Sequence, residues 1–564
     1  MGMILNVSEH LISDQKDSSS LTSEGAAGNP PPTPIETAVY AYDELSRLAS
    51  AVNNVGTVSF TYDNRGRLKT ETDVFGHVTE RVYDAANRRT QLKLDGSVHT
   101  TYNYDNANRL TTLTDEASQN FTFGYDVADR LISKALPNGV NTTYEYDGMS
   151  RLKRLKDVGP SGTLFDRQYG YDTANQISQI IEPSQTRSFG YDNIDRLTSM
   201  TNGMANESYA FDAVGNRTSS HLSSTYSYQP FNKIASTQTA NYGSDQNGNM
   251  TTKAEGSNLW RYTWDYENRL SEASTRKQRV RYKYDALGRR VRRTHGAEDT
   301  KFSYDGLDVV MDDDSVSGTT KYQNGLGIDS KLSLKQGAST NYFLADHLGS
   351  TNALTDNTGA TIASQTYDSF GNPTNSSFPS RYQFTGREYD PLTKLQYSRA
   401  RFYDPKIGRF ISEDPIGFGG GDINLYGYVR NQPSMLRDPS GEIPVWDNFW
   451  YWHYAKQCAQ GGVEAACSFN PANQSQDGLE RMAQAAFDSG SGSVSGLRFR
   501  KGYGDNEACR KMEYYSGEVW ADAFPTNMRK ISPDDPIEGT AVKIAQARPA
   551  SKLGRAWDWV KSWF

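Results

Sequence analysis

Two short motifs late in the chain place an acidic side chain directly before proline. Residues Asp414–Gly417 read Asp-Pro-Ile-Gly, and residues Asp438–Gly441 read Asp-Pro-Ser-Gly. If the fold holds the two aspartates close together, both carboxyls cannot ionise and one keeps its proton. The charged carboxyl can then activate a water molecule while the protonated one donates to a carbonyl oxygen. The alternative is structural, because Asp and Pro also favour turns by themselves.

Other reactive side chains offer less chemistry. His347 lies in a loop-like Ala-Asp-His-Leu-Gly-Ser run, and no motif gives it a Ser or Cys partner, which favours a structural role. The three cysteines, Cys458, Cys467 and Cys509, lie beyond residue 441, and their spacing is not a zinc pattern. Cys458 and Cys467 could pair after export, but the sequence leaves the connectivity open. We therefore expect no metal and no cofactor.

A repeat indicates which elements must position these residues. The segment Tyr62–Leu68 reads Tyr-Asp-Asn-Arg-Gly-Arg-Leu, and similar segments recur, mostly 20 or 21 residues apart. The copies begin at Tyr42, Tyr62, Tyr83, Tyr104, Tyr125, Tyr146, Tyr171, Tyr191, Phe211, Trp264, Tyr284 and Tyr304. Regular self-similarity at this period is typical of stacked structural repeats.

Each copy has the features of a β-hairpin. The Asp can accept a hydrogen bond from the backbone two residues on, and Gly or Asn next to the Arg suits a left-handed turn position. The alternation in Val58–Tyr62 before the Asp is the period of a strand with two faces. One hairpin cannot stand alone, but stacked hairpins form a continuous sheet. The repeated Tyr, Asp and Arg are therefore expected to build the sheet, with glycan binding by exposed aromatic rings as the alternative.

The spacing changes after Tyr304, and longer ordered motifs follow. They are Tyr342–Thr351, Tyr367–Pro373, Phe384–Asp390, Tyr397–Pro405, Gly408–Gly417, Asn424–Tyr428 and Asp438–Gly441. Together with the repeats from Tyr40 onward, these motifs resemble the Rhs repeat-associated core of bacterial polymorphic Rhs toxins and of insecticidal toxin complex C components. The teneurin YD shell is a more distant structural relative. The resemblance implies a mainly β fold, a spiralling antiparallel hairpin shell or partial cage closed by the core segment.

The resemblance also implies a cleavage site. Many members of the family cut themselves just after the second Asp-Pro-x-Gly motif. Carried over by motif, Asp414 and Asp438 are the two catalytic aspartates, Arg409 supports them, and cleavage falls near Gly441 and Glu442. The family usually has Leu where this chain has Glu442. If that apolar residue seats in a pocket beside the scissile bond, Glu442 would fit badly, so cleavage and plain turn formation both stay open.

The composition divides the chain into four parts. Residues 1–37, rich in Ser and Pro, are expected to form a flexible lead-in. Residues 38–310 hold the repeats and residues 311–441 the repeat-associated core. Residues 442–564 are expected to form a small α or α+β domain, and the resemblance implies that this position carries a variable toxin or effector.

The tail shows no recognised chemistry. Five basic residues cluster in it, at Arg498, Arg500, Lys501, Arg510 and Lys511. Interspersed acids favour a solvated face over a phosphate-binding one. Apolar residues from Leu553 to Phe564 fall at helical spacing, which favours core packing over a position at a membrane interface.

The bulk composition restricts the partners. A net charge of −7 gives no electrostatic case for nucleic acid or an anionic membrane, and no run approaches a membrane span of about 20 apolar residues. The start lacks the pattern of a signal peptide, so we expect synthesis in a bacterial cytoplasm and then secretion or surface display by another route. The expected partners are the chain's own C-terminal domain as cargo, a cognate immunity protein, and a secretion apparatus or a shell-completing partner.

Three functions remain open. The first is a toxin carrier that encapsulates and delivers a C-terminal effector in competition between cells, with or without self-cleavage. The second is a non-enzymatic adhesion or carbohydrate-binding scaffold at the cell surface. The third is a displaced C-terminal remnant of a longer gene, because a dozen or so repeats are few for a full cage.

Overall fold

The computed structural model describes residues 4–5, 37–203, 205–446, 520–521 and 529–530. Regular structure in these residues is almost all antiparallel β-sheet, with three short 3-10 helices. The mainly β fold expected from the sequence is therefore confirmed. The proposed α or α+β domain of residues 442–564 lies almost wholly outside the described residues.

The first sheet has 19 strands, each paired antiparallel with the next along the chain. They are β1 (Ile4–Leu5), β2 (Val39–Tyr42), β3 (Leu48–Asn53), β4 (Gly56–Tyr62), β5 (Leu68–Thr72), β6 (Val78–Tyr83), β7 (Arg89–Leu94), β8 (Ser97–Tyr104), β9 (Leu110–Asp115), β10 (Asn120–Tyr125), β11 (Leu131–Ala135), β12 (Asn141–Tyr146), β13 (Leu152–Gly159), β14 (Gly162–Tyr171), β15 (Ile177–Glu182), β16 (Gln185–Tyr191), β17 (Leu197–Thr201), β18 (Glu207–Phe211) and β19 (Arg217–Ser220).

The second sheet continues the same pattern with 15 strands. They are β20 (Tyr226–Gln229), β21 (Lys233–Thr237), β22 (Ala240–Ser244), β23 (Met250–Glu255), β24 (Asn258–Trp264), β25 (Leu270–Ser274), β26 (Arg279–Tyr284), β27 (Arg290–His295), β28 (Glu298–Asp305), β29 (Asp308–Asp314), β30 (Gly318–Asn324), β31 (Lys331–Gln336), β32 (Ser339–Ala345), β33 (Thr351–Thr355) and β34 (Thr361–Ser364). The ladder runs through residue 310 to Ser364, and the division of the chain at 310 stays a prediction.

The remaining elements are short. They are η1 (Phe384–Gly386), β35 (Glu388–Asp390), β36 (Leu395–Ser398), β37 (Arg401–Asp404), β38 (Arg409–Phe410), η2 (Gly417–Gly420), η3 (Val429–Asn431), β39 (Leu436–Arg437), β40 (Val445–Trp446), β41 (Trp520–Ala521) and β42 (Arg529–Lys530). Strands β35 to β38 form a small sheet, and β39 pairs with β40.

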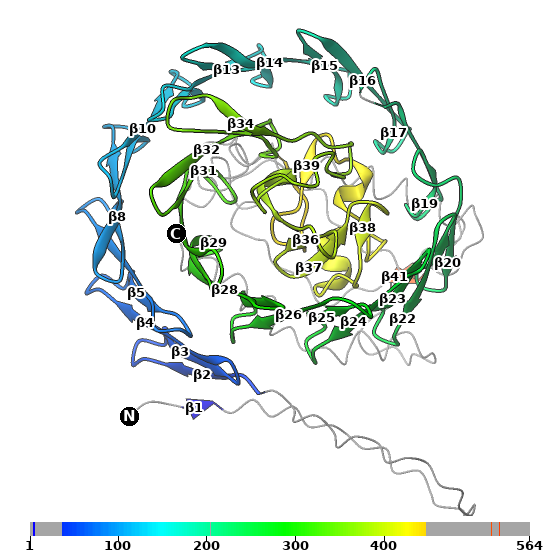
Figure 1. Ribbon diagram of the computed structural model, residues 1–564, viewed down its shortest axis with the longest axis horizontal. Coiled ribbons are helices and arrows are strands. Elements are labelled where there is room, and N and C mark those ends of the chain that lie inside the picture. Colours follow the sequence, from blue (N-terminus) through cyan, green and yellow to red (C-terminus); the bar gives the residue numbers. More distant parts are fainter. Residues whose placement is uncertain (1–3, 6–36, 204, 447–519, 522–528, 531–564) are drawn as a thin grey trace, which may run out of the picture.

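The two long sheets follow one spiral. Figure 1 shows an outer arc from β2 to β20, which then turns inward through β22 to β34. The elements from β36 to β39 lie inside this spiral, in its middle. Tyr403, Phe410 and Tyr428 are almost completely buried in this central segment and pack against Leu197 and Tyr209 of the outer arc. The expected spiral of hairpins around a core segment is therefore confirmed.

In most repeats the turn is held by its Asp and Arg. In the copy at Tyr62, Asp63 Oδ1 accepts the backbone N–H of Arg65 at 2.9 Å and of Arg67 at 3.0 Å. Asp63 Oδ2 accepts Arg67 Nε at 2.7 Å. Gly66 has a φ of +80°, the left-handed position expected between the two arginines. The turn predicted from the sequence is confirmed in this detail.

The Tyr of each repeat completes the turn before it. Tyr83 donates its hydroxyl to the carbonyl oxygen of Leu68 at 2.9 Å, and the guanidinium of Arg67 lies 4.5 Å from the centre of the Tyr83 ring. Similar hydroxyl bonds are made by Tyr62, Tyr104, Tyr125, Tyr146, Tyr171, Tyr191, Tyr284 and Tyr304. Consecutive hairpins are therefore joined by side chains as well as by the backbone ladder.

Replacing Tyr125 by Phe should lower the free energy of unfolding by about 1 kcal/mol, because the hydroxyl bond to the carbonyl of Leu110 is lost. Chemical denaturation of the whole chain measures this. The matched control is Tyr389→Phe, since the Tyr389 hydroxyl has no hydrogen bond to any described residue. Equal losses in the two variants would show that the hydroxyl bond does not join the repeats.

Side chains also join the outer arc to the inner one. Asn53 donates to the carbonyl of Tyr284 at 2.9 Å, Thr79 to that of Tyr304 at 3.2 Å and His99 to that of Tyr322 at 3.0 Å. Glu71 and Arg289, both nearly fully buried, form an ion pair at 2.5 Å. Side chains of β3, β6 and β8 in the outer arc thus bond to backbone carbonyls of β26, β28 and β30 in the inner arc.

His77 is a titratable contact between the two arcs. Its Nδ1 lies 2.9 Å from Asp95 Oδ2 and its Nε2 lies 3.2 Å from Asp313 Oδ2, on β29 of the inner arc. Burial alone would lower the pKa of His77, but the bond with Asp95 and the charges of Asp73 and Asp313 outweigh burial and raise it. The contribution of His77 to the stability of the fold is therefore complete below its pKa in the unfolded chain, about 6.5. This contribution is lost as the pH rises through the higher pKa of His77 in the folded protein.

We expect His77→Gln to lower the melting temperature at pH 5.5, with a smaller loss at pH 8.5. Thermal unfolding across this range measures the difference. The control is His295→Gln, because His295 contacts Glu298 within one hairpin and joins no two arcs. A His77→Gln loss that is the same at both pH values would contradict the ionic contact.

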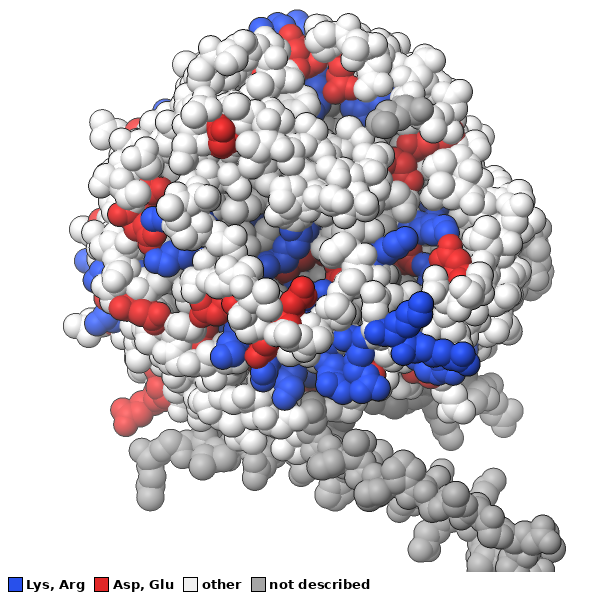
Figure 2. Space-filling view, in the orientation of Figure 1, with Lys and Arg blue, Asp and Glu red and all other residues white. Residues whose placement is uncertain are grey.

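Charges are mixed over the surface. Figure 2 shows basic and acidic side chains interspersed over much of one face, with basic ones gathered along its lower part. On the exposed side of β26, Arg279 and Arg281 both pair with Glu272 of β25.

Candidate functional site

The second Asp-Pro motif lies in the loop of a small hairpin. Leu436 pairs with Trp446 and Arg437 with Val445, so the chain from Asp438 to Pro444 forms the connection between β39 and β40. Asp438 Oδ1 accepts the backbone N–H of Gly441 at 2.9 Å and of Glu442 at 3.1 Å. The carboxyl thus holds the peptide between these two residues directly.

Gly441 is required by the space around it. Its φ is +73°, in the left-handed region, and a Cβ there would collide with the backbone oxygen of Ser398. The neighbouring carbonyl of Ser440 accepts the N–H of Ala400 at 3.0 Å. The loop therefore lies directly on the backbone between β36 and β37, which fixes its position.

The first Asp-Pro motif follows β38. The N–H of Asp414 donates to the carbonyl of Leu425 at 2.9 Å, and Asp414 Oδ1 accepts the N–H of Ile416 at 3.0 Å. The turn leads into η2, whose Gly420 lies so close that a Cβ would be 2.7 Å from Asp414 Oδ2. Both Asp-Pro motifs therefore form turns, and these turns aim their carboxyls at the same place.

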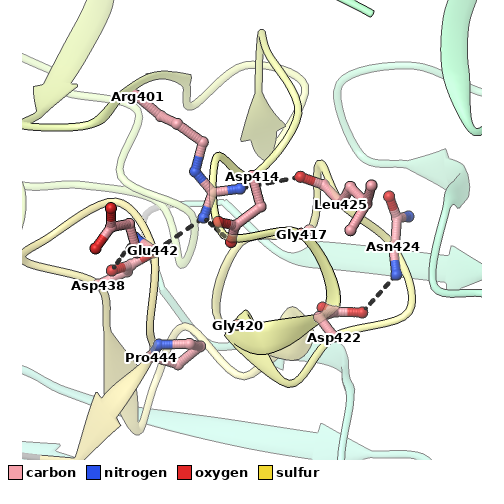
Figure 3. Close-up of a pocket in the computed structure, with 11 residues that line it drawn as sticks. Arg401, Asp414, Gly417, Gly420, Asp422, Asn424, Leu425, Asp438, Glu442 and Pro444 are labelled. Carbon is pink, nitrogen blue, oxygen red and sulfur yellow. Dashed lines mark hydrogen bonds and ion pairs between the residues drawn. The ribbon is translucent and has the colours of Figure 1, made fainter. Parts of the chain in front are cut away.

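Arg401 stands between the two carboxyls (Figure 3). This β37 residue is 3% exposed, and its Nη2 lies 2.9 Å from Asp414 Oδ2 and 3.3 Å from Asp438 Oδ2. Its Nε donates to the carbonyl oxygen of Gly441, and its guanidinium lies 3.6 Å from the ring centre of Phe410. One cation thus contacts both acids and the carbonyl of the Gly441–Glu442 peptide.

The acids of this pocket hold protons unusually strongly. Burial raises the pKa of Asp414 to about 7 against the opposing effect of Arg401, and the charges of Asp438 and Glu442 contribute. Burial likewise raises the pKa of Asp438. Burial and then the charge of Asp438 raise the pKa of Glu442 to about 7. At neutral pH the three carboxyls therefore hold fewer than three negative charges.

This arrangement suits acid–base hydrolysis of a peptide bond. A group of carboxyls that shares a proton can both accept a proton from water and donate one to a leaving nitrogen. A guanidinium bonded to the carbonyl oxygen stabilises the negative charge that develops there. All these groups surround the Gly441–Glu442 peptide.

The structure brings together Asp414 and Asp438, as the sequence indicates, but it places Arg409 elsewhere. Among the described contacts, those of Arg409 are with Asn216, Asn232, Tyr228 and Tyr426, and none is with either aspartate. Arg401 takes the position beside the acids. Arg401 lies inside the motif Tyr397–Pro405, but nothing in the spacing of the sequence singles it out.

Glu442 also lies in the pocket. It lines the pocket with Asp438, Asp414 and Arg401, where its neighbours are polar. The sequence suggested that Glu442 would fit badly in an apolar pocket, and the surroundings here are not apolar.

His347 lies in a supporting position. Its Nε2 donates to the carbonyl of Ser434 at 3.0 Å, and its ring packs against that of Tyr169 at 4.9 Å.

The tail features identified from the sequence, including Cys458, Cys467, Cys509 and the basic cluster, lie outside the described residues. Within the described part of the chain, no group of acidic, His or Cys side chains could hold a metal ion, and no helix is long and apolar enough to cross a membrane.

Comparison with known proteins identifies the architecture. The family model for the teneurin YD-shell matches residues 36–204 and 188–433, well over half of the chain. This agrees with the spiral of hairpins and the central segment described above.

Curated relatives match over shorter segments. The tRNA nuclease WapA of Bacillus subtilis is 39% identical over 108 residues, which is 18% of this chain and 4% of that protein. The toxin protein Tse5 of Pseudomonas aeruginosa is 36% identical over 104 residues, 18% of this chain and 8% of that protein. The double-stranded DNA deaminase toxin A of Burkholderia cenocepacia is 35% identical over 116 residues, 19% of this chain and 8% of that protein. The chain therefore spans less than a tenth of the length of these relatives.

Solved structures whose backbone follows a similar path include the Tc holotoxin pore of Photorhabdus luminescens. That comparison has a TM-score of 0.47 and 19% identity, and it covers 73% of this chain and 23% of the other. The resemblance to Rhs and YD-repeat proteins drawn from the sequence is thus confirmed by the family model and the relatives. The chain belongs to the teneurin YD-shell family.

Proposed function

We propose that this chain is the wall and closing segment of an Rhs-type toxin, which encloses and delivers the effector formed by residues 442–564. One observation carries the proposal. Asp414 and Asp438 share the guanidinium of Arg401 with the backbone carbonyl of Gly441, the residue at which the repeat-associated core is predicted to end. A cleavage site at that boundary would release the following segment from the wall.

In the proposed cleavage, Asp414 takes a proton from a water molecule, whose oxygen bonds to the carbonyl carbon of Gly441. The Nε of Arg401 stabilises the resulting negative oxygen. Asp438, which already accepts the N–H of Glu442, gives its proton to that nitrogen as the C–N bond breaks. The products are a carboxylate at Gly441 and a new amino terminus at Glu442, so water is the only other reactant.

This mechanism predicts a pH dependence. Because burial raises the pKa of Asp414 to about 7, the base of this mechanism is largely protonated below that pH, and cleavage should become faster as the pH rises through about 7. The charge of Glu442 is one cause of the raised pKa of Asp414. Glu442→Gln should therefore lower the pKa of Asp414 and move this increase in rate to lower pH. A time course of cleavage between pH 5 and 9 measures both, and identical profiles would contradict the role of Glu442.

The identity of the cargo rests on the relatives. Two of them are named as toxins and one as a tRNA nuclease, and the two names that state a target, tRNA and double-stranded DNA, differ in it. This supports an effector of unstated target in residues 442–564, a cognate immunity protein as its partner, and a place of action outside the producing cell.

The outer arc offers a surface for a further winding of repeats. Leu45 and Met149, each three residues after the repeat Tyr, are 72% and 61% exposed. Leu287 has the same repeat position on the inner arc, where it packs against the cluster of Val58, Phe60 and Leu68 in the outer arc. We infer that a hairpin winding, from this protein or from a shell-completing partner, covers the exposed rim in the same way.

Growth of bacteria tests the proposed cargo. Expression of residues 442–564 should arrest growth, while the full chain with Asp438→Asn should be tolerated better because its cargo stays attached. Normal growth with residues 442–564 present at detectable levels would contradict an effector that acts inside the tested cell. Stable display of the full chain at the surface without toxicity would instead favour the scaffold alternative.

A further inference from the structure

Two arginines are buried without an acidic partner where both long sheets meet the central segment. Arg217 begins β19 and is 4% exposed, and Arg409 begins β38 and is 5% exposed. Neither forms an ion pair with a carboxylate in the part of the chain that the structure describes. A buried charge is costly unless an opposite charge accompanies it.

Several N–H groups of these arginines are unused. Nε and Nη2 of Arg217 and Nε of Arg409 have no hydrogen-bond partner among the described residues. The other nitrogens of Arg409 donate to Asn216 Oδ1 at 3.4 Å and to the carbonyl of Asn232 at 2.5 Å. The guanidinium of Arg217 lies 4.1 Å from the ring centre of Phe370. All of these contacts are with neutral groups.

Both arginines line the same hollow, which encloses about 230 Å³ including its mouth. Gly408 lines it too, with a φ of +66°, and a Cβ at this position would collide with the guanidinium of Arg217. Asn424 and Asn431 complete one side, but their amides are already bonded to Asn216 and Gly215. Both arginines therefore border the same hollow.

Nearby acids do not serve as counter-ions. Burial, with a contribution from Glu207, raises the pKa of Asp368 to about 7, even though Arg217 and the bonds with Asn372 oppose the rise. Asp212 reaches Arg409 only through Asn216, whose amide donates to Asp212 at 3.0 Å. The positive charge of the hollow is thus poorly compensated from within the protein.

We propose that this hollow binds a small oxyanion of the phosphate class, which accepts the unused N–H groups of Arg217 and Arg409. Guanidinium groups match the oxygens of phosphate in geometry and charge. The small volume and deep burial fit a free ion better than a phosphate of a polymer. Because the arginines come from β19 and β38, the ion would fasten the end of the first sheet to the central segment.

Thermal unfolding of the full chain with inorganic phosphate tests the site, with chloride keeping the ionic strength constant. The melting temperature should rise with phosphate and then saturate. In Arg409→Gln the apparent affinity should be at least about tenfold weaker, because one charge-assisted hydrogen-bonding group is lost. The matched control is Arg281→Gln, which removes one charge from a side chain that is 57% exposed.

The outcomes separate clearly. Saturation that weakens in Arg409→Gln but not in Arg281→Gln supports the site. Absence of saturation in the wild type overturns it, and so does an equal response in all three proteins, which means an adventitious ion only. If Arg409→Gln does not fold, Arg409→Lys decides: weaker binding supports the site and unchanged binding overturns it.

Discussion

The Asp438→Asn variant will stay at full length, while the wild-type chain separates into residues 1–441 and 442–564. Asp438 contacts Arg401 and accepts the N–H groups on both sides of the Gly441 carbonyl. An amide can keep these backbone bonds but can no longer supply an acidic proton. Loss of a general acid or base slows a reaction by about 10²- to 10⁴-fold. Gel electrophoresis and mass spectrometry of the purified chain over time measure the effect.

Asp414→Asn should have a similar effect, since Asp414 shares Arg401 with Asp438. The matched control is Asp356→Asn, which changes a half-buried aspartate in the turn between β33 and β34, outside the pocket. That control should separate as the wild type does. If the wild type itself stays at full length, or if both pocket variants separate normally, the cleavage proposal fails.

Replacing Asp329 by Ala should destabilise the fold more than any surface change. Asp329 is buried between two cations, 2.5 Å from Arg387 and 2.7 Å from Arg399. Removing it leaves Arg387 buried without its carboxylate and leaves Arg399 with only Asp308, 3.7 Å away, which costs about 3–5 kcal/mol. Arg399 also donates to the carbonyl of Pro439 at 2.5 Å, so the loop of the second Asp-Pro motif should loosen as well. Chemical denaturation and the rate of cleavage measure the two consequences.

Acid provides an independent check on Asp329. Burial opposes ionisation of Asp329, but the charges of Arg387 and Arg399 outweigh burial and lower its pKa to about 2. Its stabilisation is therefore present above the unfolded value of about 3.9 and is lost as the pH falls through about 2. The control, Glu145→Ala, removes a half-exposed partner of Arg154 and should cost less than about 1 kcal/mol. A similar cost for both variants would contradict the importance of the buried triad.

The sequence predicts the local architecture well because each repeat carries its own turn. Asp63 and Gly66 act within a few residues of each other, so the bonds and the left-handed turn follow from residue type. The hydroxyl bond of Tyr83 to Leu68 was not predicted, although it repeats with the period. It depends on where a neighbouring strand ends, which the residue types alone do not reveal.

Contacts between distant segments could not be read from spacing. Asn53 and Tyr284 are 231 positions apart, and only the curvature of the sheet brings them together. The same holds for the site. The Asp-Pro motifs identify Asp414 and Asp438, but Arg401 reaches them from a separate strand. Arg409 belongs to the same motif as Asp414, Gly408–Gly417. It lines instead the hollow that it shares with Arg217.

The bond from each repeat Tyr back to the strand before it has a consequence for synthesis. Tyr83 reaches Leu68 only 15 positions earlier, and Tyr104 reaches Arg89 over the same separation. Contacts this local form quickly, and a chain leaving the ribosome folds from its N-terminal side first. Each emerging hairpin therefore pairs with the edge strand of the hairpins that have already folded. The hydroxyl of its Tyr then bonds to the carbonyl at the preceding turn. The outer arc is in place before the central segment emerges, and residues 442–564 leave the ribosome after that segment.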